Sequence, residues 1–151
     1  MKRTSIIAAA LIISALGMFT MSFKGTSGRN SSTHFMEWKW ADVEHQAEVR
    51  NKPIFMFVGA SYCNISARMN FVFRQKEVGA ILNENFVCNK MFSDEGIMNN
   101  LRASNWGVTT VPTYLFFTSK GKLVYKSQGF KDKENMLAEI QTAMQKINEA
   151  K

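Results

Sequence analysis

The stretch KPIFMFVGASYCNIS, residues 52–66, decides the fold of this chain of 151 residues. Its core, Ile54–Val58, is continuously apolar instead of alternating between apolar and polar side chains. A strand of this kind is buried on both faces, which is typical of a sheet that carries helices on both sides. Small and polar residues follow the strand, and we expect a helix to begin near Cys63.

Cys63 lies where the strand gives way to this helix. Backbone N–H groups and the positive end of the helix dipole converge there, and both stabilise a thiolate. A dithiol redox motif has cysteine at both ends of C-x-x-C, but the second position here is Ser66. The Ser66 hydroxyl can donate to a Cys63 thiolate or satisfy a backbone donor in the first turn of the helix, but it cannot attack a disulfide.

The remaining chain continues this pattern of helices and strands. Pro53 ends a first helix, residues 119–121 indicate a hairpin turn, and Asp132 is a candidate N-cap for the last helix. That helix has core-facing spacing at Leu137, Ile140, Met144 and Ile147. The expected helices are 40–50, 63 to a break at 74–75, 76–83, 94–103 and 132 onward, and the expected strands are 54–58, 86–92, 114–117 and 123–125. This order predicts an α/β fold with a mixed central sheet and helices on both faces.

The N-terminus has the pattern of an export signal. Lys2 and Arg3 precede a stretch from Ile6 to Phe19 that is almost wholly apolar or small, and shorter than the roughly 20 residues of a membrane span. We expect a signal segment at 1–22, a linker at 23–35 and one domain at 36–151. The protein is then periplasmic or secreted, and it contacts the membrane only if the signal segment stays uncleaved.

Composition and charge exclude several functions. The formal net charge is +7, but the basic residues are scattered among acidic ones and are not interleaved with aromatic residues, so we expect no nucleic-acid partner. His34 and His45 are distant in sequence from both cysteines, so we expect no metal and no cofactor. Cys88 lies within a predicted strand, where we expect a buried residue that does not pair with Cys63.

The chain resembles the thioredoxin superfamily. The resemblance rests on residues 52–57 before 62–66, and on Val111-Pro112-Thr113 before the apolar residues 114–117. Within the superfamily it is similar to exported bacterial domains, including the thioredoxin-like domain of transmembrane disulfide reductases. The resemblance implies a thioredoxin-like fold across roughly residues 38–146.

The resemblance also implies roles for individual residues. Cys63 would be the attacking thiol and Pro112 a cis proline facing it. The unpaired backbone of Val111 would then bind an extended substrate segment, and Tyr62 would form an aromatic shoulder of the same groove. Phe57 takes the position at which the family often has a buried acid, although Lys90, at the position of its common lysine neighbour, is present.

These residues support two functions. The first is thiol–disulfide exchange with client proteins through Cys63 alone, in which a partner or external thiol releases the mixed disulfide. The alternative is a non-catalytic binding module of the cell envelope that keeps the groove at Pro112, with Cys63 as an inert remnant. A structural subunit of an envelope complex is a third reading.

Overall fold

The computed structural model describes residues 32–150, so the expected signal segment 1–22 lies outside the described residues. In chain order the elements are α1 (Trp40–Arg50), β1 (Ile54–Gly59), α2 (Asn64–Phe73), α3 (Lys76–Asn85), β2 (Val87–Phe92), α4 (Ile97–Asn105), β3 (Thr113–Phe117), β4 (Leu123–Gln128) and α5 (Lys133–Glu149). The predicted α/β fold with a mixed sheet is confirmed.

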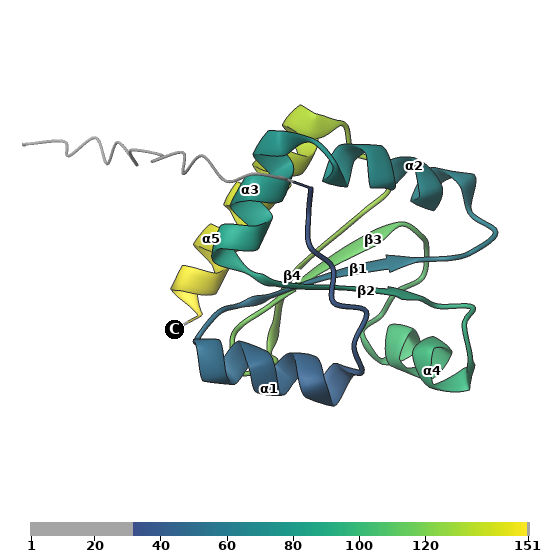
Figure 1. Ribbon diagram of the computed structural model, residues 1–151. Coiled ribbons are helices and arrows are strands. Elements are labelled where there is room, and N and C mark those ends of the chain that lie inside the picture. Colours follow the sequence, from purple (N-terminus) through teal and green to yellow (C-terminus); the bar gives the residue numbers. More distant parts are fainter. Residues whose placement is uncertain (1–31, 151) are drawn as a thin grey trace, which may run out of the picture.

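The sheet has four strands in the order β2-β1-β3-β4. Strands β1 and β2 are parallel, whereas β3 is antiparallel to both β1 and β4. Helices α2, α3 and α5 cover one face of the sheet, and α1 and α4 cover the other (Figure 1). The antiparallel hairpin and the parallel pair together make the sheet mixed, as the order of elements predicted.

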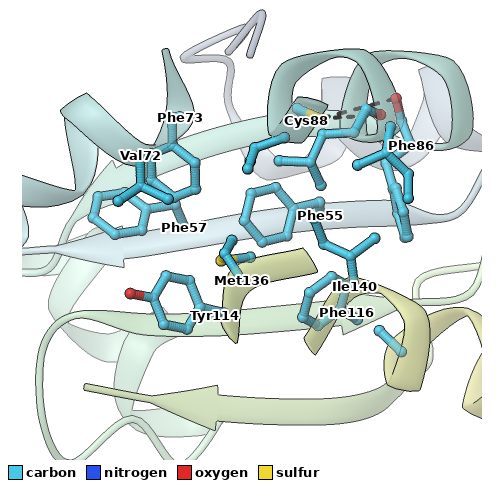
Figure 2. Packing of buried hydrophobic residues seen from close by; sticks show 14 of the residues in the cluster. Phe55, Phe57, Val72, Phe73, Phe86, Cys88, Tyr114, Phe116, Met136 and Ile140 are labelled. Atoms are coloured by element: carbon cyan, nitrogen blue, oxygen red, sulfur yellow. Dashed lines mark hydrogen bonds between the residues drawn. The ribbon is translucent and has the colours of Figure 1, made fainter. Parts of the chain in front are cut away.

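Every residue of β1 is buried, and its side chains alternate between two cores. Phe55 and Phe57 point into the larger core under α2, α3 and α5, where aromatic rings gather (Figure 2). Ile54, Met56 and Val58 point to the opposite face and pack with residues of α1 and of the loop after α4. The continuous apolar run is therefore explained by burial on both faces.

The last two helices differ in detail from the sequence expectation. Helix α4 begins at Ile97, not at Asp94, because Gly96 has a φ of 87° and Asp94 lies in the preceding turn. Asp132 caps α5 as predicted, accepting a hydrogen bond of 2.8 Å from the Asn135 N–H. The fully buried stripe of α5 consists of Met136, Ile140, Ala143 and Ile147, whereas the expected Leu137 and Met144 lie at its partly buried edge. The small Ala143 lies on the face that packs against the core.

The segment before α1 packs along the outer edge of β2. The Met36 N–H donates to the Cys88 carbonyl at 3.0 Å, and the Thr33 N–H donates to the Phe73 carbonyl at 2.7 Å. The ring of Phe35 lies edge-on to that of Phe73, with centroids 5.0 Å apart. The last residues of the segment expected to be a linker, 32–35, therefore belong to the packed domain.

Within residues 32–150, none of the helices is both long enough and apolar enough to cross a membrane.

Candidate functional site

Cys63 is the N-cap of α2. Its Sγ accepts a hydrogen bond from the Ser66 N–H at 3.4 Å, and its thiol donates to the Val111 carbonyl at 3.8 Å. Cys63 is partly exposed. Its sulfur lies at the start of a helix and beside Val111, which is 48 residues later in the sequence. This position provides the N–H donors and the helix dipole that stabilise a thiolate.

Ser66 is buried directly behind the sulfur, at 2% exposure. Its hydroxyl has no hydrogen-bond partner among the described residues while Cys63 is a thiol, so it does not serve as a backbone cap. The pKa of Cys63 is lowered by hydrogen bonds from the Ser66 hydroxyl and then from the Ser66 N–H, with a smaller contribution from Ile65, against the opposing effect of partial burial. We infer that the hydroxyl is a donor kept for the thiolate, because a buried hydroxyl without a partner is otherwise costly.

The loop opposite Cys63 contains a cis peptide bond between Val111 and Pro112, as the resemblance implied. Among the described residues the Val111 N–H donates no hydrogen bond, and the Val111 carbonyl accepts one only from the Cys63 thiol. The Pro112 carbonyl in turn accepts from the Gly129 N–H at 2.8 Å. The backbone at Val111 is therefore available to a segment added as a short strand.

Tyr62 lies beside this loop and is 77% exposed. It lines a cavity of about 460 Å³ together with Val111, the 108–110 loop and one side of α4. A larger cavity of about 670 Å³ lies between the segment 37–41, β2 and α4, and Cys63 does not line it. Cys63 lines neither cavity, and we place the site at the smaller one because it is lined by Tyr62, the residue before Cys63, and by Val111, whose carbonyl accepts from the Cys63 thiol.

Asp94, which the sequence analysis did not single out, contacts the turn just before Cys63. Both of its carboxylate oxygens accept from the Ser61 N–H, at 2.9 and 3.1 Å, and one also accepts from the Ser61 hydroxyl. The Ser61 hydroxyl and N–H lower the pKa of Asp94. Because parallel strands β1 and β2 end at the same edge, polar residues just after each were a usable signal for this contact.

The described residues place no proton-relay acid beneath the sulfur. Phe57 lies in the aromatic core, with its ring 5.1 Å from that of Phe73. The ammonium group of Lys90 pairs instead with Glu37 of the N-terminal segment, at 2.8 Å. Both cysteines are free, and burial raises the pKa of the Cys88 thiol. Within residues 32–150, no three His, Cys, Asp or Glu side chains gather as a metal site would require.

Comparison with known proteins supports the thioredoxin-like fold. The model of a protein family described as "Thioredox_DsbH: Protein of unknown function, DUF255" matches residues 26–150. The fold is similar to that of a putative disulphide-isomerase from Bacteroides thetaiotaomicron, with a TM-score of 0.68 and 26% identity over 78% of this chain and 97% of that one. It is also similar to a thioredoxin from Thermus thermophilus, with a TM-score of 0.68 and 18% identity over 80% and 92% of the two chains.

A protein described as DsbH oxidoreductase has a TM-score of 0.64 and 13% identity, over 81% of this chain and 92% of that one. At this identity the likeness shows the fold alone. No curated protein sequence matches the chain significantly.

Replacing Ser66→Ala is expected to raise the pKa of Cys63 toward that of an ordinary cysteine, because it removes the largest stabilising hydrogen bond of the thiolate. Iodoacetamide reacts with the thiolate, so the alkylation rate increases as the pH passes the pKa of Cys63. The midpoint of this increase should lie at a lower pH in the parent than in the variant. Cys63→Ser should abolish alkylation of the folded protein, since Cys88 is buried. Identical pH profiles for the parent and Ser66→Ala would contradict the role given to the hydroxyl.

Proposed function

The chain belongs to the Thioredox_DsbH family, and on this premise we propose that it exchanges thiols and disulfides with client proteins through Cys63 alone. The observation that carries the proposal is the position of the Cys63 sulfur. It accepts from the Ser66 N–H at the start of α2 and lies 3.8 Å from the carbonyl before a cis proline. A lowered pKa increases the fraction of Cys63 present as thiolate at a given pH, and the thiolate is the nucleophile.

The reaction requires no other residue of this chain to change its covalent state. The Cys63 thiolate attacks one sulfur of a client disulfide, a bond forms between these two sulfurs, and the second client sulfur leaves as a thiolate. The number of disulfide bonds is unchanged by this step. Electrons and atoms therefore balance without an external oxidant.

Release of the client requires a second thiol from outside the site. Ser66 occupies the position of a resolving cysteine, and its hydroxyl cannot attack a disulfide. Cys88 is buried and hydrogen-bonded to the Leu82 carbonyl at 3.6 Å, so it is not available. The release thiol is therefore a second cysteine of the client, a reductase partner or a small-molecule thiol.

The groove beside the sulfur suits an extended client segment. The Val111 N–H has no partner within residues 32–150, and the exposed ring of Tyr62 forms one side of the adjoining cavity. Backbone pairing of this type gives affinity without demanding one particular sequence.

A non-catalytic binding module is the second candidate. Phe57 and Ser66, in place of an acid and a resolving cysteine, favour it, because both changes remove parts of a dithiol cycle. The lowered pKa of Cys63 favours exchange, since a remnant cysteine has no need of a stabilised thiolate.

We further propose that the chain is exported, to the periplasm or out of the cell. The support is the pattern of Lys2, Arg3 and the apolar stretch that follows, which is typical of a signal segment ending near residue 22.

Trapping tests the exchange function directly. When thiols are quenched with acid and the exported protein is isolated, we expect disulfide-linked adducts with client proteins that disappear with Cys63→Ser. Cys88→Ser is the matched control and should leave the adducts unchanged. Adducts that persist without Cys63, or a complete lack of adducts, would leave the binding module as the better proposal.

Replacing Ser66→Cys should restore an internal disulfide. The Cα atoms of residues three positions apart in a helix are about 5 Å from each other, within the Cα–Cα range of a disulfide. The variant should reduce insulin with repeated turnover in the presence of a thiol donor, whereas the parent should show little turnover and accumulate mixed disulfides. Because Phe57 supplies no buried acid, we expect partial activity. A variant that neither forms the bond nor turns over would indicate a groove no longer suited to redox chemistry.

N-terminal sequencing of the mature protein tests export. We expect a new terminus between Gly17 and Lys24 if the signal segment is cleaved. Protein in the cytosol that begins at Met1 would contradict the export proposal.

A further inference from the structure

We propose that Arg68, held against the ring of Phe130, recognises an acidic side chain near the reacting cysteine of the client. This proposal rests on the exchange function above and specifies the class of client. The guanidinium carbon of Arg68 lies 4.5 Å from the centroid of the Phe130 ring. The two residues are 62 positions apart and come from α2 and from the loop before α5.

Two routes through the structure lead from the Cys63 sulfur to this pair. Along α2, Arg68 follows Cys63 by five residues and is exposed on the next turn of the helix. Across the site, the sulfur contacts the Val111 carbonyl, and the neighbouring Pro112 carbonyl accepts from the Gly129 N–H at 2.8 Å. Phe130 follows directly. The pair is therefore connected to the sulfur along two routes, although neither residue lines the cavity of Tyr62 and Val111.

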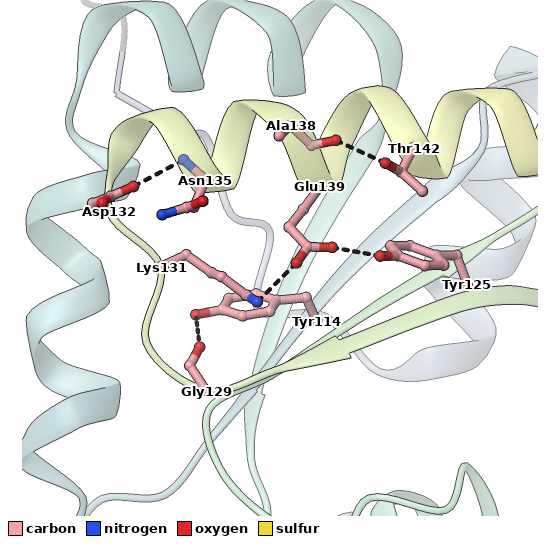
Figure 3. Close-up of polar contacts among 9 residues, drawn as sticks. All are labelled: Tyr114, Tyr125, Gly129, Lys131, Asp132, Asn135, Ala138, Glu139 and Thr142. Carbon is pink, nitrogen blue, oxygen red and sulfur yellow. Dashed lines mark hydrogen bonds and ion pairs between the residues drawn. The ribbon is translucent and has the colours of Figure 1, made fainter.

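The loop that carries Phe130 is fixed on both sides (Figure 3). Before it, the Gly129 carbonyl accepts from the Tyr114 hydroxyl at 2.8 Å. After it, the Lys131 ammonium lies 2.7 Å from Glu139 of α5, with side-chain exposures of only 20% and 17%. Glu139 also accepts from the Tyr125 hydroxyl at 2.6 Å. Phe130 is thus presented at a defined place, while its ring remains 43% exposed.

Near Phe130, the Asp132 carboxylate accepts from the Asn135 N–H at the start of α5 and does not pair with Arg68. Within residues 32–150 Arg68 forms no ion pair, whereas the nearby Lys131 is matched by Glu139. The carboxylate of Asp94, close to Cys63 along the turn, is engaged by the Ser61 N–H and hydroxyl. A guanidinium that stacks on a ring still presents its N–H groups at the edge, where it binds a carboxylate through paired hydrogen bonds.

We expect a client segment that pairs with the Val111 backbone to extend from Cys63 toward Arg68 and Phe130. Its cysteine faces Cys63, so side chains adjacent in the client sequence lie near Arg68, beside the half-exposed Ile65. Charge complementarity therefore favours a glutamate or aspartate next to the client cysteine and disfavours lysine or arginine there.

Three blocked peptides test this preference, each containing one cysteine flanked by Glu, Gln or Lys and supplied as its disulfide-linked dimer. The initial rate of peptide attachment to Cys63 is followed by mass spectrometry at low salt. For each peptide, this rate is divided by the rate at which the same peptide dimer reacts with 2-mercaptoethanol, a neutral thiol. The ratio removes differences in the intrinsic reactivity of the three disulfides. We expect the Glu peptide to exceed the Lys peptide by about five-fold, with Gln between them, and the preference to shrink in high salt.

The chain offers a matched control for the arginine. Arg74 is the C-cap of the same helix, at the end opposite Cys63, and its guanidinium carbon lies 5.9 Å from the centroid of the Phe71 ring. Arg68→Gln should lose the preference for Glu over Lys, whereas Arg74→Gln should retain it. Phe130→Ala should reduce the preference by freeing Arg68, and Phe130→Tyr, which keeps the ring, should retain it.

The outcomes separate this proposal from the proposed function. Equal rates for the three peptides in the parent, or a preference that Arg68→Gln and Arg74→Gln change alike, would overturn the recognition by Arg68 and leave exchange through Cys63 intact. No peptide attachment at all would overturn the exchange function, and recognition would fall with it.

Discussion

Strand β1 is buried along its whole length between two layers of helices, and the position of Cys63 depends on that burial. Its apolar side chains supply both cores, so helices must cover both faces of the sheet. Because β1 and β2 are parallel, their carboxyl ends lie at the same edge of the sheet. The turn at that edge is held by the contact between Ser61 and Asp94, and α2 begins immediately after it with Cys63 as its N-cap.

Loops from distant parts of the chain then surround the sulfur. The Val111 carbonyl contacts it, the Pro112 carbonyl is bound to the Gly129 N–H, and Phe130 reaches back to Arg68 of α2. The sulfur is thus held by the start of α2 and by the loops that contain Val111 and Gly129. A reactive group needs such support from its surroundings, because a small displacement weakens every interaction that depends on geometry.

At two positions the chain departs from the pattern that the resemblance implies, and both departures remove part of a dithiol cycle. Ser66 stands where the resemblance implies a resolving cysteine, and Phe57 stands where it often implies a buried acid. Phe57 instead adds a ring to the aromatic core, and Lys90, its neighbour in the register, pairs with Glu37 outside the sheet. The groups that stabilise the Cys63 thiolate remain. They include the buried Ser66 hydroxyl, which has no hydrogen-bond partner among residues 32–150.

The sequence by itself determined the order of helices and strands, the two-faced burial of β1, the N-terminal position of Cys63 on its helix and, through the resemblance, the cis bond before Pro112. Each depends on local pattern: periodicity, an N-cap side chain or a short motif. Local pattern did not indicate that residues 32–35 pack against the domain, that Ala143 replaces Met144 in the buried stripe of α5, or that Arg68 meets Phe130. Those features join residues far apart in the chain, so only the packing of helices and loops around the sheet decides them.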